Sequence, residues 1–396
     1  MRGESFPLQN QNEGRGNSPR PSFWYNSPMS ENNRIVFLDY LRVVACFMVM
    51  VVHACECFYF GGDGGLHYDS ASDAFWATWI DSAVRACVPL FVIASSYLLF
   101  PVTKPTGEFF KRRLVRVVVP FAIWCALYVW RFDGKTVDCL FNFPMATGGH
   151  LWFVPMLLGL YILMPLLSPW AERASEKEVR GWLILWLFTT TFPFLRKLCG
   201  MWCGAPSYGV TPYLYGECPW NEFGTFQFVS GFFGYLLLGL YFRKFVPTLS
   251  WRKTLAIAAP LWIVGYAVIG SLFYFRIPGG GVFPVSNTYA KVVDLEMSWM
   301  FCSTGVALTV IAYFLILRKL TFDGWFYVKV IRPLSAASYG TYLMHIMVLV
   351  VLAEHLKGSV PTPVAIAGIA AGSFAVSSVV SMIICRIPFI GKWVGG

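Results

Sequence analysis

Residues 34–53 form an apolar run, RIVFLDYLRVVACFMVMVVH, that contains Asp39, Arg42 and His53. The run is long enough to cross a lipid bilayer as one helix. On insertion scales a charged residue at the centre of such a helix costs about 2.5–3.5 kcal/mol, so ionisable side chains there usually serve a function. Histidine accepts and releases protons near neutral pH, which makes His53 a candidate general base.

The spacing of these residues places them along one side of the predicted helix. Arg42 and His53 are eleven residues apart, which leaves them about 20° apart around the helix axis and about 16 Å apart along it. Asp39 precedes Arg42 by three residues, so the two side chains can pair. This arrangement suits a polar passage across the membrane. The alternative interpretation is an interfacial ion pair that only anchors the helix.

Arg85 is a second cation inside a predicted span, in the apolar run DSAVRACVPLFVIASSYLLF, which begins at Asp81. Asp81 and Arg85 stand at i, i+4 with the acid first, the order that helix pairs prefer. This helix is predicted to run back across the membrane, so Arg85 should lie at a depth similar to that of His53. An ion pair that only stabilises the helix is the alternative.

Arg113 and Arg116 form a basic pair in EFFKRRLVRVVVP. At i, i+3 they project from one face of a helix, where two guanidinium groups can bind phosphates through forked, charge-assisted hydrogen bonds. The alternative is topological, because cytoplasmic loops collect lysine and arginine whatever they bind.

The composition predicts the kind of molecule that holds these residues. Of the 396 residues, 57% are hydrophobic and only 13% are charged, whereas a soluble domain has about 25% charged residues. The fold class is therefore an all-α membrane protein in contact with the lipid bilayer. The excess of 31 Lys and Arg over 21 Asp and Glu is explained by membrane topology, so no nucleic acid partner is predicted.

Apolar runs predict a polytopic bundle of about ten transmembrane helices. They lie near residues 35–53, 79–101, 114–131, 150–169, 181–197, 226–246, 253–273, 297–317, 337–354 and 363–385. With the N-terminus inside, 22 of the 31 Lys and Arg residues fall in inward segments. The positive-inside rule thus predicts that both the N- and C-termini are cytoplasmic.

The first 33 residues differ from the rest of the chain. They are rich in Asn, Gly, Pro and Ser, and this composition predicts a disordered segment at residues 1–33, followed by one transmembrane domain at residues 34–390. Met29 lies just before the first apolar run, and we expect translation to start there.

Cysteines and histidines do not form a zinc-ligand pattern in this sequence. Cys139, Cys199, Cys203 and Cys218 fall in predicted outward loops. Disulfides can form in an oxidising space, but the pairing does not follow from sequence. The site residues are accordingly predicted to include no metal ligand.

Five stretches, in order over roughly residues 34–390, resemble motifs of the acyltransferase 3 family of integral-membrane acyltransferases. RIVFLDYLRVVACFMVMVVH is similar to the first helix of that family, and RACVPLFVIASSYLL to its Pro-Leu-Phe-Phe…Ser-Gly signature. KRRLVRVVVP is similar to its Arg-x-x-Arg followed by Pro. HLWFVPMLLGLYILMPLL and SYGTYLMH resemble its His-Leu-Trp-Phe segment and its final Gly-x-Tyr-Leu-x-His element. One departure is Ser96, where the family usually has Gly, which puts the close helix packing at that point in doubt.

The resemblance implies transfer of an acyl group, often acetyl, from acyl-CoA to a hydroxyl or amine. Acyl-CoA (acetyl-CoA) would be a donor substrate, with no cofactor bound permanently. The acceptor would be a cell-surface glycan or a related small compound, and the location the cell's inner or plasma membrane. By the same resemblance His53 matches the essential histidine of the family, Arg42 its first-helix arginine, and Arg113 and Arg116 its Arg-x-x-Arg.

These elements together give a mechanistic hypothesis. Acyl-CoA phosphates would dock at Arg113 and Arg116, the pantetheine arm would pass Arg42, and His53 would act as general base or carry the acyl group. Arg85 would stabilise the developing oxyanion.

The acceptor side is expected at the start of the fourth helix. His150 and Trp152 would contact the acceptor there, with an interfacial tryptophan belt as the alternative. His345 is interpreted as a buried, hydrogen-bonded core histidine. A second function remains open, namely a transporter or flippase of a lipid-linked sugar, although the inverted repeats common in transporters are not apparent.

Overall fold

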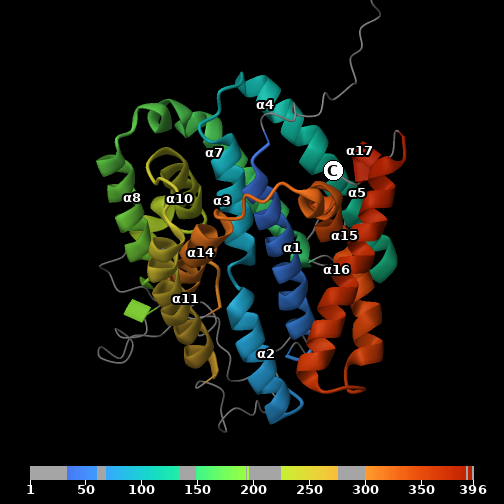
Figure 1. The fold of residues 1–396 in the computed structure, drawn as a ribbon. Coiled ribbons are helices and arrows are strands. Elements are labelled where there is room, and N and C mark those ends of the chain that lie inside the picture. Colours follow the sequence, from blue (N-terminus) through green and yellow to red (C-terminus); the bar gives the residue numbers. More distant parts are fainter. Residues whose placement is uncertain are drawn as a thin grey trace, which may run out of the picture. The chain divides into compact units, whose positions relative to one another are not determined.

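The computed structural model describes residues 34–59, 68–133, 149–192, 194–195, 224–274, 299–388 and 391–394. The predictions made for residues 1–33 and for Cys139, Cys199, Cys203 and Cys218 lie outside these residues. The chain divides into two units, Met1–Ile35 and Val36–Gly396, and the described helices belong to the second (Figure 1).

Helices make up nearly all of the described chain, and these residues contain no strand. The α-helices are α1 (Val36–Glu56), α2 (Ala71–Val84), α3 (Cys87–Leu99), α4 (Thr106–Arg113), α5 (Val119–Tyr128), α7 (Phe153–Arg173), α8 (Glu176–Thr189), α10 (Phe233–Lys244), α11 (Trp251–Tyr274), α14 (Thr304–Leu317), α15 (Arg332–Leu356), α16 (Thr362–Arg386) and α17 (Gly391–Val394). Three π-helical turns, η2 (Leu114–Val118), η3 (Val129–Asp133) and η7 (Tyr327–Ile331), and two 3₁₀ turns, η4 (Gly149–Trp152) and η6 (Gly224–Val229), extend or precede them.

Seven helical segments of the described chain are long and apolar enough to cross a membrane. They are Val36–Glu56, Ala71–Leu99, Thr106–Phe132, Gly149–Arg173, Trp251–Leu272, Tyr327–Leu356 and Thr362–Arg386. Large apolar side chains remain exposed on them, as on Leu166 of α7 and Ile263 of α11, which are 74% and 60% exposed. Exposed apolar side chains of this size are favoured in contact with lipid tails rather than with water. The chain is therefore an all-α polytopic membrane protein.

The ten predicted helices all coincide with helical residues, but the lengths differ. The predictions at 181–197, 226–246 and 297–317 correspond to the shorter helices α8, α10 and α14. The helix predicted to begin at residue 114 begins at Thr106, because the charged stretch before it is also helical. That predicted to begin at residue 337 begins at Tyr327. The number of spans and the cytoplasmic termini stay predictions.

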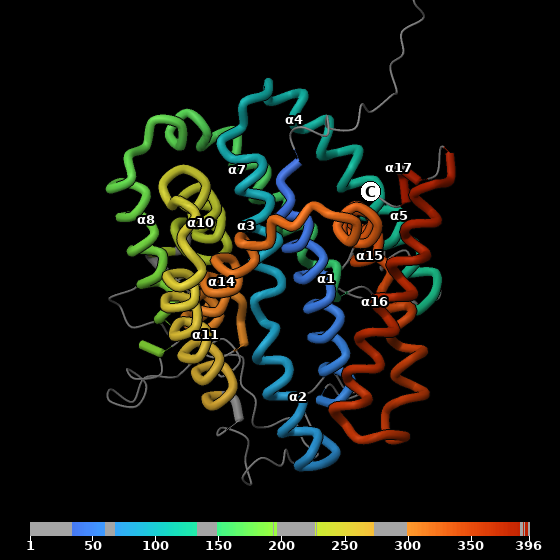
Figure 2. Tube along the Cα trace, viewed as in Figure 1, coloured from blue at the N-terminus to red at the C-terminus, as the bar shows by residue number. Residues whose placement is uncertain are grey.

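Helix α1 is packed on several sides by α2, α3, α15 and α16 (Figure 2). Its contacts with α15 fix a parallel register. Ser335 donates to Asp39 (2.6 Å), the Cys46 thiol donates to the Ser338 carbonyl (3.7 Å), and His53 lies beside His345. Asp39, Cys46 and His53 are spaced by seven residues, two turns each, so one side of α1 faces α15 throughout.

Prolines explain where the long helices become irregular. Pro89 has no N–H for the Arg85 carbonyl, and α2 gives way to α3 at Arg85 and Ala86. The π-turns η2 and η7 likewise end two residues before Pro120 and Pro333. A proline ring also clashes with the carbonyl four residues earlier, and a wider turn relieves that clash.

Several basic residues of the predicted inward segments bind helix ends. Lys244 donates to the carbonyls of Ala171, Glu172 and Ala174 at 2.8–3.0 Å, just where α7 ends. Arg243 donates to the carbonyls of Tyr97 and Phe100 at the end of α3. Cations are favoured at helix C-termini, where carbonyls lack partners.

Ser96, the departure from the family motif, lies at a close contact between α3 and α10. Its hydroxyl donates to the Leu236 carbonyl at 2.5 Å. Gly239 makes the room, because a Cβ there would lie 2.6 Å from both Cβ and Oγ of Ser96. The close packing is therefore present, with glycine on the partner helix and the extra hydroxyl hydrogen-bonded.

Replacing Gly239 by alanine should destabilise the protein, because the new methyl group has no space beside Ser96. We expect Gly239→Ala to lower the free energy of unfolding by about 1–3 kcal/mol, seen as a lower thermal midpoint in detergent. Gly159→Ala is the matched control, since a Cβ at this helical glycine meets nothing within 4 Å. Equal midpoints for both variants would contradict the packing argument.

Candidate functional site

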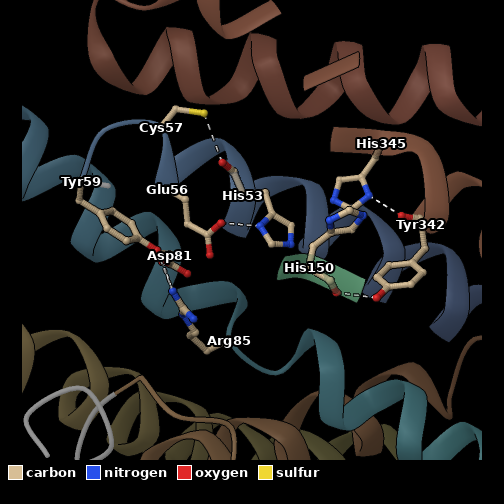
Figure 3. A network of polar contacts seen from close by, with 9 residues as sticks. All are labelled: His53, Glu56, Cys57, Tyr59, Asp81, Arg85, His150, Tyr342 and His345. Atoms are coloured by element: carbon tan, nitrogen blue, oxygen red, sulfur yellow. Dashed lines mark hydrogen bonds and ion pairs between the residues drawn. The ribbon is translucent and has the colours of Figure 1, made fainter. Parts of the chain in front are cut away.

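Three histidines from separate elements meet inside the helix bundle (Figure 3). The ring centroid of His53 on α1 lies 5.1 Å from that of His345 on α15 and 6.2 Å from that of His150 in η4. The centroids of His150 and His345 are 5.0 Å apart. His345 is fully buried and His150 is 8% exposed, while the side chain of His53 is 17% exposed. We refer to these residues as the histidine cluster.

Glu56 is the carboxylate of this site, and sequence reasoning missed it. Its Oε2 lies 2.5 Å from Nδ1 of His53, three residues earlier on α1. An ionised carboxylate only accepts hydrogen bonds, so Nδ1 carries the proton and Nε2 of a neutral His53 keeps its lone pair. The i, i+3 spacing of His53 and Glu56 in HACE was the available signal.

Tyr342 holds both of the other histidines. Its hydroxyl donates to the His150 carbonyl at 2.6 Å, and its own carbonyl lies 2.5 Å from Nδ1 of His345. A carbonyl only accepts, so His345 also presents an unprotonated Nε2 when neutral. Nε2 of His150 and of His345 is buried without a hydrogen-bond partner among the described residues. A buried polar atom in this state costs about 1–3 kcal/mol, so both atoms are suited to meet a ligand.

His345 has two roles in the structure. It is buried and hydrogen-bonded, as the interpretation of a core histidine requires. It also lies against His53, so it belongs to the histidine cluster, which sequence reasoning did not foresee. SYGTYLMH contained the signal, because Tyr342 and His345 are one turn apart on the same face.

Arg85 lies at the break between α2 and α3 and forms a buried network with Asp81 and Tyr59 (Figure 3). It pairs with Asp81 and donates to the Tyr59 hydroxyl at 3.1 Å. The Tyr59 hydroxyl in turn donates to Asp81 at 3.0 Å. Burial, followed by the charge of Asp81, raises the pKa of Tyr59 well above its ordinary value, so this hydroxyl stays protonated. In Figure 3 the Glu56 carboxylate lies between this network and His53.

Asp39 and Arg42 lie away from the histidine cluster, towards the start of α1. Asp39 is 1% exposed and accepts hydrogen bonds from the hydroxyls of Tyr327 (2.7 Å) and Ser335 (2.6 Å). Arg42 is 3.5 Å from it, with a side chain 30% exposed. Asp39 is therefore the anchor that joins α1 to η7 and α15, and the predicted pair with Arg42 is present.

Arg113 and Arg116 lie on either side of the junction between α4 and η2. The half-buried guanidinium of Arg113 is 5.6 Å from the Phe109 ring and 5.5 Å from the Tyr161 ring. Its Nε is buried without a hydrogen-bond partner among the described residues. The neighbouring Arg112 instead pairs with Glu108 at 2.5 Å.

Trp152, in η4 with His150, stacks on other aromatic rings. Its ring lies 5.5 Å from that of Phe301 and 5.9 Å from that of Phe232. The guanidinium carbon of Arg85 is 6.0 Å from the same Phe301 ring. One aromatic wall therefore extends from the turn that holds His150 to the Arg85 network.

Comparison with known proteins gives a match to a family model. The model of the acyltransferase 3 family, described as an acyltransferase domain, matches residues 35–382, nearly the whole chain. No curated protein and no solved structure matches significantly.

Loss of the Asp39 carboxylate should weaken the attachment of α1 to α15. Asp39→Ala removes the acceptor of two buried hydroxyls and the partner of Arg42, so we expect a loss of about 3 kcal/mol in the free energy of unfolding. Thermal unfolding in detergent measures it. Asp323→Ala, at an exposed aspartate before η7, is the control and should leave the midpoint unchanged. A wild-type midpoint for Asp39→Ala would show that this carboxylate does not anchor the helix.

Proposed function

Since the chain belongs to the acyltransferase 3 family and is a multi-pass membrane acyltransferase, we propose that it moves an acyl group, in particular acetyl, from cytosolic acyl-CoA to a hydroxyl or amine of a cell-surface carbohydrate or related small acceptor. It would act in the cell's inner or plasma membrane. The observation that carries the proposal is the pair of His53 and Glu56 inside the histidine cluster. A carboxylate that fixes the tautomer of a histidine is the arrangement that prepares a general base.

His53 begins the reaction as the base. Its Nε2 takes the proton of the acceptor hydroxyl or amine while the acceptor atom attacks the thioester carbonyl of acyl-CoA. The new bond forms to the carbonyl carbon, the carbon–sulfur bond then breaks, and the thiolate leaves with the proton from His53. Glu56 stabilises the imidazolium of His53 between these steps, because the negative carboxylate lies beside Nδ1 of that ring. Arg85 stabilises the negative oxygen of the intermediate.

His150, His345 and Trp152 bind the acceptor in this proposal. The Nε2 atoms of His150 and His345 have no hydrogen-bond partner among the described residues, and that of His345 is an acceptor because its Nδ1 faces the Tyr342 carbonyl. Hydroxyl and amine groups are the donors that would satisfy them. Trp152 adds an aromatic face, and aromatic rings can pack against the apolar face of a sugar.

The donor end lies at Arg113 and Arg116. In Figure 1, α4, which ends at Arg113, lies at the end of the bundle where α1 begins, whereas His53 stands near the other end of α1. The Arg113 guanidinium has no carboxylate partner among the described residues, so it is suited to bind phosphates. Tyr339 of α15 donates to the Val117 carbonyl of η2 at 2.8 Å and stacks near Tyr342.

One side of α15 thus connects η2, the turn that contains Arg116, to the histidine cluster. The pantetheine arm would follow this side of α15, with Arg42 of α1 opposite. Asp39 holds Arg42 in position through their ion pair.

The base and its carboxylate are tested together. His53→Ala should lower acyl-CoA turnover by about 10²–10⁴-fold, the usual contribution of a general base, and Glu56→Gln should lower it by a smaller factor because the tautomer is no longer enforced. Release of CoA by purified protein is measured, with mass spectrometry of acceptor glycans. His355→Ala is the control, because His355 is exposed and bonded to its own helix. Unchanged turnover in His53→Ala, or acceptor export without acylation, would contradict the proposal.

The donor site is tested by neighbouring arginines. Arg113→Ala should raise KM for acyl-CoA about tenfold or more with little change in kcat, because phosphate binding contributes equally before and during the reaction. Arg112→Ala should behave as wild type, since Arg112 pairs with Glu108 on the surface. Steady-state kinetics with acetyl-CoA measures both. The same KM in the two variants would place the phosphates elsewhere.

A further inference from the structure

The network of Tyr59, Asp81 and Arg85 is a second polar centre beside the histidine cluster. Its three residues are 2%, 0% and 8% exposed. The hydrogen bonds join the three residues in a closed ring. Nη2 of Arg85 donates to both Asp81 and Tyr59, and the Tyr59 hydroxyl donates to Asp81. Burial of an ion pair is rarely required for stability alone, since its desolvation offsets much of the attraction.

The arrangement leaves one side of the Arg85 guanidinium unused. Its Nε–H has no hydrogen-bond partner among the described residues. The face of the group lies 4.6 Å from the centre of the Trp299 ring, which fixes its plane. The Nε–H is therefore held in one direction, although no described protein group receives its hydrogen bond.

The backbone joins this network to the base. Tyr59 lies three residues after Glu56, and its N–H donates to the Glu56 carbonyl at 3.2 Å. The turn that ends α1 thus carries His53 and Glu56 on one side and the hydroxyl that holds Arg85 on the other. A change at Tyr59 reaches Arg85 through its hydroxyl alone, because phenylalanine would keep the ring contacts with Trp299 and Tyr68.

We infer that Asp81 and Tyr59 are positioning residues that aim the Nε–H of Arg85 at the oxygen on which negative charge develops during acyl transfer. This inference rests on the proposed function, where Arg85 is the oxyanion donor. A donor fixed before the reaction needs no reordering when the charge appears, which is the main source of electrostatic catalysis. Asp81 supplies the counter-charge that lets a guanidinium stay buried, and Tyr59 fixes its orientation through a second contact.

The experiment measures kcat and KM for acetyl-CoA with purified full-length protein. We expect Tyr59→Phe to lower kcat about tenfold at an unchanged KM, less than the loss of about 10²–10³-fold on removing an oxyanion donor outright, because Arg85 itself remains. Tyr313→Phe is the matched control, because this tyrosine of α14 also donates its hydroxyl hydrogen to α2, in this case to the Ala83 carbonyl at 2.8 Å. It should keep the wild-type kcat. Thermal midpoints in detergent establish that both variants are folded.

A double variant shows whether Tyr59 acts through Arg85. Arg85→Lys keeps the charge beside Asp81 but has no Nε–H in the guanidinium position. If the inference holds, Arg85→Lys lowers kcat, and adding Tyr59→Phe lowers it no further. Losses that multiply would overturn the inference. Asp81→Asn, which removes the charge at nearly constant shape, is the second variant and should also lower kcat rather than raise KM.

The outcomes separate this inference from the proposed function. Wild-type kcat in Tyr59→Phe, together with inactive His53→Ala, would overturn the positioning role and leave the acyltransfer proposal standing. Activity retained by His53→Ala would remove the acyltransfer mechanism itself.

Discussion

The parallel pairing of α1 with α15 is the constraint on which the rest of the structure depends. At one end the Asp39 carboxylate receives two hydroxyls from η7 and α15. At the other end the rings of His53 and His345 meet. A helix that carries ionisable residues on one side can remain in a membrane only if that side faces protein, and the carboxylate fixes which side it is. The rotation of α1 that buries Asp39 therefore also brings His53 to the other histidines.

Irregular helix geometry is concentrated where the polar residues lie. Arg85 stands at the break caused by Pro89, and Arg116 lies in the π-turn that precedes Pro120. Regular helices satisfy their own backbone, which leaves few places in a membrane where a side chain and free backbone groups coincide. The prolines create such places. His150 follows the same rule, since it lies in a short 3₁₀ turn rather than in α7 itself.

Much of this organisation could be predicted from sequence, for identifiable reasons. Hydropathy located the helices because a bilayer demands long apolar segments, and seven of the ten reach that length in the described chain. The pairs of Asp39 with Arg42 and of Asp81 with Arg85 followed from helical spacing alone. The i, i+4 spacing of Glu108 and Arg112 would likewise have predicted that Arg112 is paired with a carboxylate, and so distinguished it from Arg113.

The histidine cluster could not be predicted in the same way. Whether His150 and His345 meet depends on the rotation of helices far apart in the chain, and a single sequence contains no measure of that rotation. The interpretation of His345 as a core histidine was right about its burial and incomplete about its neighbours. A buried histidine bonded to a carbonyl and one placed beside a reacting group look alike in sequence, because both need an apolar helix and one nearby acceptor.

The π-turn of Leu114–Val118 makes chain length matter in its own right. A π-turn holds about one residue more than an α-turn, so the loss of one residue there would restore regular winding with α4 and α5 at nearly the same rotation about the helix axis. An added residue would instead turn α4 relative to α5 by about 100° and move Arg113 off the Tyr161 ring, although every other side chain was unchanged. The interval from Arg113 to Pro120 is thus more sensitive to an insertion than to the loss of one residue.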